Sequence, residues 1–356
     1  MGTIVSRKRK DGTAGHTAQI RLKKDGKVIH SESQTFDRKP AAQAWLKKRE
    51  TELAQPGALT KATDPLLKDV IDQYNLEKQK EHGKTKTQVL NTIKTADIGG
   101  LHCSEINSQE LVKFCQTIDA QPSTRGNYMS HLASIFSVAK PAWGYPLEKQ
   151  AIDDARVVLD KMGLIGRSKQ RTRRPTLEEL DKLMTHYTVA ETKRKNAIPM
   201  TRLLLFAIFS TRRQEEICRL EWNDLNKVNS EIIVRDMKNP GETIGNDVRT
   251  TLTPEALQLI ELQPNTNGPI WPYNAESVSA SFTRACVILG IENLHFHDLR
   301  HEGISRLFEL GWNIPLVASV SGHRSWMSLK RYTHLRQTGD KYKGWPWLEK
   351  IFSAKQ

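Results

Sequence analysis

Six residues of this chain have side chains suited to work on a phosphodiester. Most are cationic, and guanidinium, ammonium and imidazole groups can meet the negative charge of a phosphoryl transition state. A tyrosine among them can supply a nucleophilic oxygen. They are Arg213, Lys238, His297, Arg300, His323 and Tyr332. The set predicts a site that cuts a nucleic-acid strand with a tyrosine nucleophile.

Acidic clusters and metal-ligand patterns of comparable quality are absent from the sequence, so we predict chemistry without a metal or another cofactor. The array His295, His297 and His301 could suggest zinc. We disfavour that alternative, because His297 fits the phosphodiester site better. Glu216 and Asp298 could suggest a two-carboxylate hydrolase, but we expect these carboxylates to pair with arginines and orient them.

The composition favours a polyanionic partner. The 356 residues have a formal charge of +14, and double-stranded DNA is the natural candidate. No run of about 18 apolar residues suggests a membrane span, and the first residues lack the apolar stretch of a signal peptide. The four cysteines are scattered and form no CxxC pair. We therefore expect a cytoplasmic, nucleoid-associated protein without disulfides.

The chain divides into three segments of different character, which predicts an α+β multidomain fold. Residues 1–60 hold 13 Lys/Arg against six Asp/Glu, and their pattern predicts strands at 16–22, 28–31 and 33–36, then a helix over 40–54. Residues 65–162 have helical apolar stripes and predict an all-α domain. Residues 174–356 predict a mainly helical domain with a small antiparallel sheet.

The last segment has clear local signals. Thr176 and Glu179 form a capping box that opens a helix. Residues 200–210 are nearly all apolar and predict a buried helix, and 230–253 predict two strands around a Pro-Gly turn. Helices are expected at 253–262, 276–289 and 326–335. Before this segment, residues 163–175 predict an extended, exposed linker whose arginines could cross a DNA groove.

These pieces together resemble the catalytic domain of the tyrosine recombinases, the phage-type integrases. The resemblance covers about the last half of the chain. Its pieces are 210-STRRQEEICRL-220 with Arg213, the hairpin lysine Lys238, 297-HDLR-300, 322-GH-323, and Tyr332 nine residues after His323. By the same resemblance, residues 1–60 are expected to be an arm-type DNA-binding domain and 65–162 a core-binding domain.

The resemblance also implies roles. Tyr332 is expected to attack the scissile phosphate, form a 3′-phosphotyrosine and release a 5′-hydroxyl. Arg213 and Arg300 would bind the non-bridging oxygens, because planar guanidinium groups donate paired hydrogen bonds. Lys238 would protonate the leaving oxygen. His297 would assist proton transfer at the tyrosine, and His323 would donate a hydrogen bond to the phosphate.

Three alternatives stay open at this point. Arg212 is a second candidate for the position of Arg213, because the family has a glycine where Thr211 stands, and only glycine adopts positive φ freely. The activity could also be that of a type IB-like topoisomerase, or the chain could be a non-enzymatic DNA-binding protein that keeps the fold. We favour a site-specific recombinase that acts as a homotetramer on DNA, with possible accessory directionality or DNA-bending proteins.

The C-terminal tail has an apolar face that must be covered. This face comprises Trp345, Trp347, Leu348, Ile351 and Phe352. It can pack on its own domain or on a neighbouring subunit, and we prefer the second arrangement.

Overall fold

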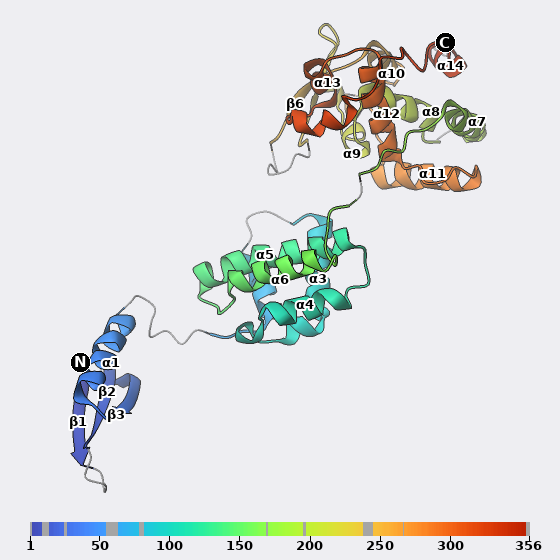
Figure 1. Ribbon diagram of the computed structural model, residues 1–356. Helices are drawn as coiled ribbons and strands as arrows, with labels where there is room; N and C mark the ends of the chain where they lie inside the picture. The colour runs from blue at the N-terminus through green and yellow to red at the C-terminus, as the bar shows by residue number, and fades with distance from the viewer. Residues whose placement is uncertain are drawn as a thin grey trace. The chain divides into compact units, whose positions relative to one another are not determined.

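The computed structural model describes residues 2–8, 14–24, 27–54, 63–77, 82–168, 170–194, 197–237, 245–265 and 267–353. It separates into two compact units, Met1–Lys169 and Gln170–Gln356 (Figure 1). Helices dominate, and the described residues form two three-stranded antiparallel sheets. The predicted α+β fold class is confirmed. Within the described ranges, no helix is both long and apolar enough to cross a membrane.

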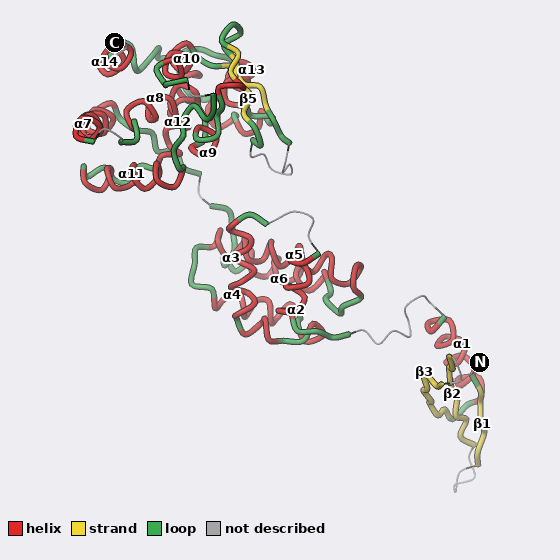
Figure 2. Tube along the Cα trace, turned by 180° about the vertical axis from the view of Figure 1, so that it is seen from behind, coloured by secondary structure: helices red, strands yellow, loops and turns green. Residues whose placement is uncertain are grey.

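The N-terminal sheet has the order β1-β2-β3, with β1 at Thr3–Lys8, β2 at Ala14–Lys24 and β3 at Lys27–Phe36, and helix α1 follows at Lys39–Leu53 (Figure 2). Ala18 and Ile20 of β2 and Ala42 of α1 are fully buried. Two predictions were wrong here: β1 was missed, and 28–31 and 33–36 belong to one strand. A register shift between Leu22 and Lys23 lets β3 pair along its whole length.

The rest of the first unit is helical, as predicted. Its helices are α2 (Leu67–Leu76), α3 (Lys84–Thr95), α4 (Ser108–Thr117), α5 (Pro122–Trp143) and α6 (Lys149–Lys161). The predicted apolar stripes form one core, in which Ile71, Leu111 and Ile135 are fully buried.

Two cations of this helical set are engaged in contacts within the unit. The ammonium group of Lys86 donates to the hydroxyl of Tyr74 at 2.8 Å. Nε of Arg125 donates to the carbonyl of Ile118, also at 2.8 Å. The sequence pattern marked both positions as polar, but it could not identify these acceptors on other helices and turns.

The second unit combines helices with a small sheet of order β4-β5-β6. Its helices are α7 (Leu177–Lys193), α8 (Met200–Ser210), α9 (Gln214–Ile217), α10 (Pro254–Glu261), α11 (Ala275–Ile288), α12 (Phe296–Glu309), α13 (Ile314–Ser321) and α14 (Pro346–Ser353). Its strands are β4 (Leu225–Asn226), β5 (Glu231–Val234) and β6 (Val248–Thr251). The capping box of Thr176 and Glu179 is present. The two-residue strand β4 was missed, because so short a strand has no period.

Arg171, Arg173 and Arg174, in the segment before α7, are bound within the second unit, which corrects the expectation that they are free to cross a DNA groove. Arg171 donates two hydrogen bonds to Asp298, at 3.0 and 2.7 Å. Arg174 donates to Glu302 at 2.7 Å and to both oxygens of Glu309. The segment is extended, as predicted, but these acceptors lie more than a hundred residues away and could not be read from the local charge pattern.

The C-terminal tail packs on the core of its own unit, not in the arrangement that we preferred. Trp347, Leu348 and Phe352 contact this core, and the indole nitrogen of Trp345 donates to Asp181 of α7 at 2.7 Å. The apolar face is therefore at least partly covered within one chain.

Candidate active site

Helix α8 fixes the first arginine of the candidate site. Apart from the half-buried Arg202, every residue of this helix is buried, so the core holds its axis firmly. The helix ends at Thr211, whose φ of 56° and ψ of 22° are left-handed. A threonine therefore adopts a conformation that glycine takes more easily, and the chain turns so that Arg213 is the N-cap residue of α9. Such a conformation costs a non-glycine residue about 1–2 kcal/mol, which the packing of α8 must offset.

The two adjacent arginines have different environments. Nη1 of Arg213 donates to Glu216 at 2.6 Å, and its side chain is 30% exposed. Arg212 is buried; its guanidinium donates to the carbonyls of Ser210, at 3.1 Å, and Val320. Its Nη1 has no hydrogen-bond partner among the described residues. Arg213 is thus accessible to an external phosphate, whereas Arg212 ties the end of α8 to α13.

Arg300 joins three segments at the centre of the site. It lies in the first turns of α12, and its side chain is only 4% exposed. Its guanidinium donates to the carbonyl of Thr211 and, at 3.0 Å, to that of Ser321. Nη1 lies 3.9 Å from Glu216. Burial, together with the nearby charges of Arg212 and Arg213, lowers the pKa of Arg300 to about 9, so it still carries its charge at neutral pH.

Glu216 balances part of this positive charge. Burial alone would raise the pKa of its carboxyl group, but Arg212, Arg300 and Arg213 hold that pKa below its ordinary value. Asp298 is likewise fully buried and paired, in its case with Arg171. Both carboxylates therefore pair with arginines, as predicted.

His323 lies beside Arg300. Gly322, with φ of 70°, ends α13 and turns the chain toward the site. This positive φ strains any residue with a side chain, so glycine suits the turn. Nε2 of His323 is 3.4 Å from Nη2 of Arg300, and Nδ1 is 2.8 Å from the hydroxyl of Ser321. Burial and the surrounding arginines lower the pKa of His323 to about 3, which keeps it neutral at physiological pH.

Tyr332 lies in a 3-10 turn, Lys330–Tyr332, that follows another such turn, Trp326–Ser328. The continuous helix that we predicted over 326–335 is therefore wrong. Tyr332 is 6% exposed, and its ring stacks on Phe308 of α12 with 6.0 Å between centroids. Burial raises the pKa of its hydroxyl above the ordinary value, although Arg331 and Arg300 oppose that shift.

A histidine outside our predicted set lies at the tyrosine oxygen. Nδ1 of His301 is 2.5 Å from the hydroxyl of Tyr332. His297, to which we assigned proton transfer, lies one turn earlier on the exposed side of α12. Its ring meets that of His301 nearly at a right angle, with 5.0 Å between centroids. Among the described residues, His297 has no hydrogen bond to Tyr332. The available signal was the i, i+4 spacing of the two histidines.

The remaining predicted residue, Lys238, lies outside the described residues. The other five all lie in the second unit. Contacts link Arg213, Glu216, Arg300 and His323 in one group, and Tyr332, His301 and His297 in another.

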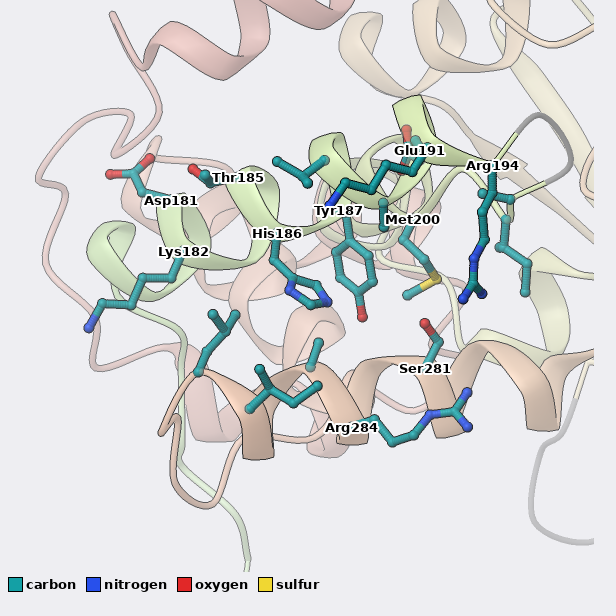
Figure 3. Close-up of a pocket in the computed structure, with 18 of the residues that line it drawn as sticks. Asp181, Lys182, Thr185, His186, Tyr187, Glu191, Arg194, Met200, Ser281 and Arg284 are labelled. Carbon is teal, nitrogen blue, oxygen red and sulfur yellow. The ribbon is translucent and has the colours of Figure 1, made fainter.

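A groove of about 1240 Å³ in the same unit lies apart from this constellation. It runs between α7 and α11, and Figure 3 shows His186 and Tyr187 facing Ser281 and Arg284 across it. None of the predicted catalytic residues lines it. The groove is therefore separate from the cluster of arginines and histidines that forms the candidate site.

Comparison with known proteins agrees with this geometry. Residues 173–338 match the model of the phage integrase family. This match covers just under half of the chain. The match contains all six predicted site residues.

The proteins similar to this chain include a shufflon-specific DNA recombinase of Escherichia coli, 34% identical over 212 residues. That match covers 58% of this chain and 49% of the relative, so the chain spans about half of the relative's length. A putative integrase/recombinase of Haemophilus influenzae is 23% identical over 363 aligned positions, which cover 96% of this chain and 90% of the relative.

Solved structures share the fold of this chain. The Tn1549 transposon integrase in complex with a circular intermediate DNA has a TM-score of 0.58 at 13% identity, over 75% of this chain and 94% of that one. A lambda integrase dimer bound to a COC′ core site has a TM-score of 0.57 at 17% identity, over 92% and 94%. At such low identity, the likeness establishes the fold alone.

Proposed function

We propose that this chain is a site-specific DNA recombinase that cuts and rejoins strands through a 3′-phosphotyrosine at Tyr332. The observation that supports this best is the convergence of Arg213, Arg300 and His323 from separate parts of the sequence. Buried guanidinium groups are costly unless their charge is used or paired. Here one carboxylate, Glu216, lies between two arginines, which leaves net positive charge for a phosphate.

The proposed roles follow from these environments. Arg213 and Arg300 bind the non-bridging oxygens, and His323, as a neutral imidazole, donates a hydrogen bond to the same phosphate. Lys238 protonates the leaving 5′-oxygen. Because Tyr332 exchanges one phosphodiester for another, a second strand's 5′-hydroxyl can reverse the step without ATP or a metal.

We propose double-stranded DNA as the partner, with cleavage and rejoining in a homotetramer on chromosomal DNA in the cytoplasm. The relatives named above are recombinases and integrases, and one solved lambda integrase is a tetramer bound to a Holliday junction. The domain division into 1–60, 65–162 and 174–356 is part of the same proposal. The excess of basic residues in 1–60 suits an arm-type DNA-binding domain, and accessory DNA-bending or directionality proteins would act on such an assembly.

Covalent selection tests the proposal and finds the DNA site in the same experiment. The full-length protein is incubated in EDTA with nicked duplexes that carry a random central sequence, and protein-linked DNA is recovered under denaturing conditions and amplified. We expect wild type to become enriched on one sequence family and Tyr332→Phe to form no adduct. An adduct formed by Tyr332→Phe, or no adduct with wild type at any round, would overturn the proposal. A topoisomerase would form adducts without enriching a sequence.

A further inference from the structure

The hydroxyl of Tyr332 has a hydrogen-bond partner in the structure. Nδ1 of His301 lies 2.5 Å from it, well within hydrogen-bond distance. A protonated phenol and a neutral imidazole nitrogen form a complementary pair, in which the phenol donates. The contact therefore involves the O–H group of Tyr332, whose bond must break when the tyrosine acts as a nucleophile.

The surrounding packing holds this contact in place. His301 and Phe308 are seven residues apart on α12, two turns along one face. The ring of Tyr332 stacks on Phe308 with an interplanar angle of 11°, and its ring centroid lies 6.1 Å from that of His301. Leu329, fully buried, anchors the turn that carries the tyrosine. One helix thus positions both the face of the phenol ring and its oxygen.

The charge state of His301 suits an acceptor. Burial, the neighbouring ring of His297 and the charge of Arg331 lower the pKa of His301 to about 4. The ring is therefore neutral at physiological pH, and one of its nitrogens is free to accept. Because the pKa of Tyr332 is raised, the proton stays on the phenol until attack begins.

We propose, on the basis of the proposed function, that His301 is the catalytic residue that receives the hydroxyl proton of Tyr332 during strand cleavage. As the phenol oxygen forms its bond to phosphorus, the O–H bond breaks and its proton moves to Nδ1 of His301. The bond from phosphorus to the 5′-oxygen breaks, and that oxygen takes a proton from a separate donor. In the reverse step, His301 returns the proton to the phenol.

This transfer does not require a free phenolate beforehand. The phenol becomes more acidic as its oxygen donates electrons to phosphorus, so the proton moves within the transition state. The scissile phosphate also brings negative charge close to the cations that depress the pKa of His301, which raises the basicity of this imidazole when DNA is bound. General base catalysis of this kind is worth roughly 10²–10⁴-fold in rate.

The test measures single-turnover adduct formation on a duplex obtained by the covalent selection described above. His301→Asn places an amide oxygen near the position of Nδ1, so it can accept a hydrogen bond but cannot take the proton. His301→Ala removes both functions. His186→Asn, in the groove of Figure 3, is the matched control for loss of a histidine from the same unit. Folding of each variant is checked by thermal unfolding.

We expect both His301 variants to slow adduct formation roughly 10²-fold or more, with DNA affinity within threefold of wild type (about 0.65 kcal/mol or less). The control should match wild type. Added imidazole should accelerate His301→Ala. A second substrate has sulfur in place of the bridging 5′-oxygen, and its leaving group needs no proton. On this substrate, a variant that lacks the proton donor to the leaving group would form the adduct at the wild-type rate. The defect of a proton acceptor should persist.

Three results would overturn the assignment. A His301→Asn rate near wild type would show that the histidine only positions the tyrosine. A defect that vanishes on the sulfur substrate would make it the proton donor to the leaving group. If added imidazole does not accelerate His301→Ala, His301 is not a general base. This experiment also tests the proposal if His301→Asn does not fold. Absence of any wild-type adduct would instead remove the proposed function, and the inference with it.

Discussion

Gly303 of α12 lies directly against the carbonyl of Ile208 in α8. A Cβ built on Gly303 would come within 1.9 Å of that oxygen, so the two helices can approach this closely only with glycine at the crossing. Because α8 leads into Arg213 and α12 carries Arg300, this contact sets the spacing of the two arginines.

Gly303→Ala should therefore damage both stability and activity. The added methyl group must push the helices apart, and overpacking of this kind costs about 1–3 kcal/mol. We expect a lower free energy of unfolding in urea and loss of most DNA cleavage. Gly100→Ala is the control, because a Cβ there meets nothing within 4 Å. Equal stability of Gly303→Ala and wild type would contradict the close approach.

Arg213→Ala and Arg300→Ala should both abolish most cleavage but differ in stability. Loss of one transition-state donor lowers the rate roughly 10²–10³-fold, whereas one charge among many phosphate contacts changes DNA affinity little. Both substitutions remove a cation from the buried carboxylate of Glu216, but Arg300→Ala also leaves the buried carbonyls of Thr211 and Ser321 unsatisfied. It should therefore lose about 1–3 kcal/mol more stability than Arg213→Ala.

Single-turnover cleavage, filter binding and urea unfolding separate these effects. Arg219→Ala, at an exposed position in the same segment, is the control and should behave like wild type. A large loss of DNA affinity with cleavage intact would argue against both assignments.

Glu302 should be a main source of stability in the second unit. Its fully buried carboxylate accepts hydrogen bonds from Arg174 at 2.7 Å, Lys341 at 2.9 Å and the hydroxyl of Tyr342 at 3.1 Å. Glu302→Ala should lower the free energy of unfolding by about 2–4 kcal/mol. This is toward the lower end for a broken buried ion pair, because Arg174 and Lys341 keep partial contact with water.

The comparison for Glu302→Ala is Glu178→Ala, which breaks the exposed pair with Lys182. That variant should lose less than about 1 kcal/mol. Calorimetry of both would test the difference, and similar losses would show that burial of Glu302 adds nothing.

Acid should destabilise the second unit from about pH 6.5 downward. The pKa values of His301 and His323 fall in the folded state to about 4 and about 3, so between the ordinary value of 6.5 and these values the unfolded chain binds more protons. Stability must then decrease as the pH falls. At still lower pH, protonation of Glu302 and Asp298, whose pKa values are lowered on folding, removes further stability.

Urea unfolding at pH 7 and pH 5 tests the histidine part. The two histidines together should cost about 2–4 kcal/mol over that interval. The double variant His301→Asn, His323→Asn should lose much of this dependence, whereas His186→Asn should keep it. A wild-type stability that is flat between these pH values would contradict the neutral state of the buried imidazoles.

The sequence predicted elements whose signals are local. Helix α8 has the predicted bounds because its apolar run is continuous, and α7 begins at its capping box. The turns around Tyr332 were predicted as a regular helix. Buried Leu329 and Tyr332 are three residues apart, a spacing that a 3-10 turn also satisfies, and tertiary packing decided between the two.

Other features depend on partners that are distant in sequence. The acidic acceptors of Arg171 and Arg174 come from α12, so a run of basic residues looked like a free linker. The hydrogen-bond partner of Tyr332 could not be predicted for a similar reason. His297 and His301 are both plausible by spacing, and only the rotation of α12 against the turn at Tyr332 places His301 at the oxygen.

The left-handed turn at Thr211, directly after α8, fixes the point at which Arg213 leaves the packed helix, in the half of the site that we propose binds the phosphate. Arg213 and Arg300 issue from packed helices, so little conformational entropy remains for them to lose on binding. Tyr332 is carried instead by two single turns, which have few backbone hydrogen bonds of their own. We therefore expect Tyr332 to move if in-line attack requires a change of position, while Arg213 and Arg300 hold the phosphate in place.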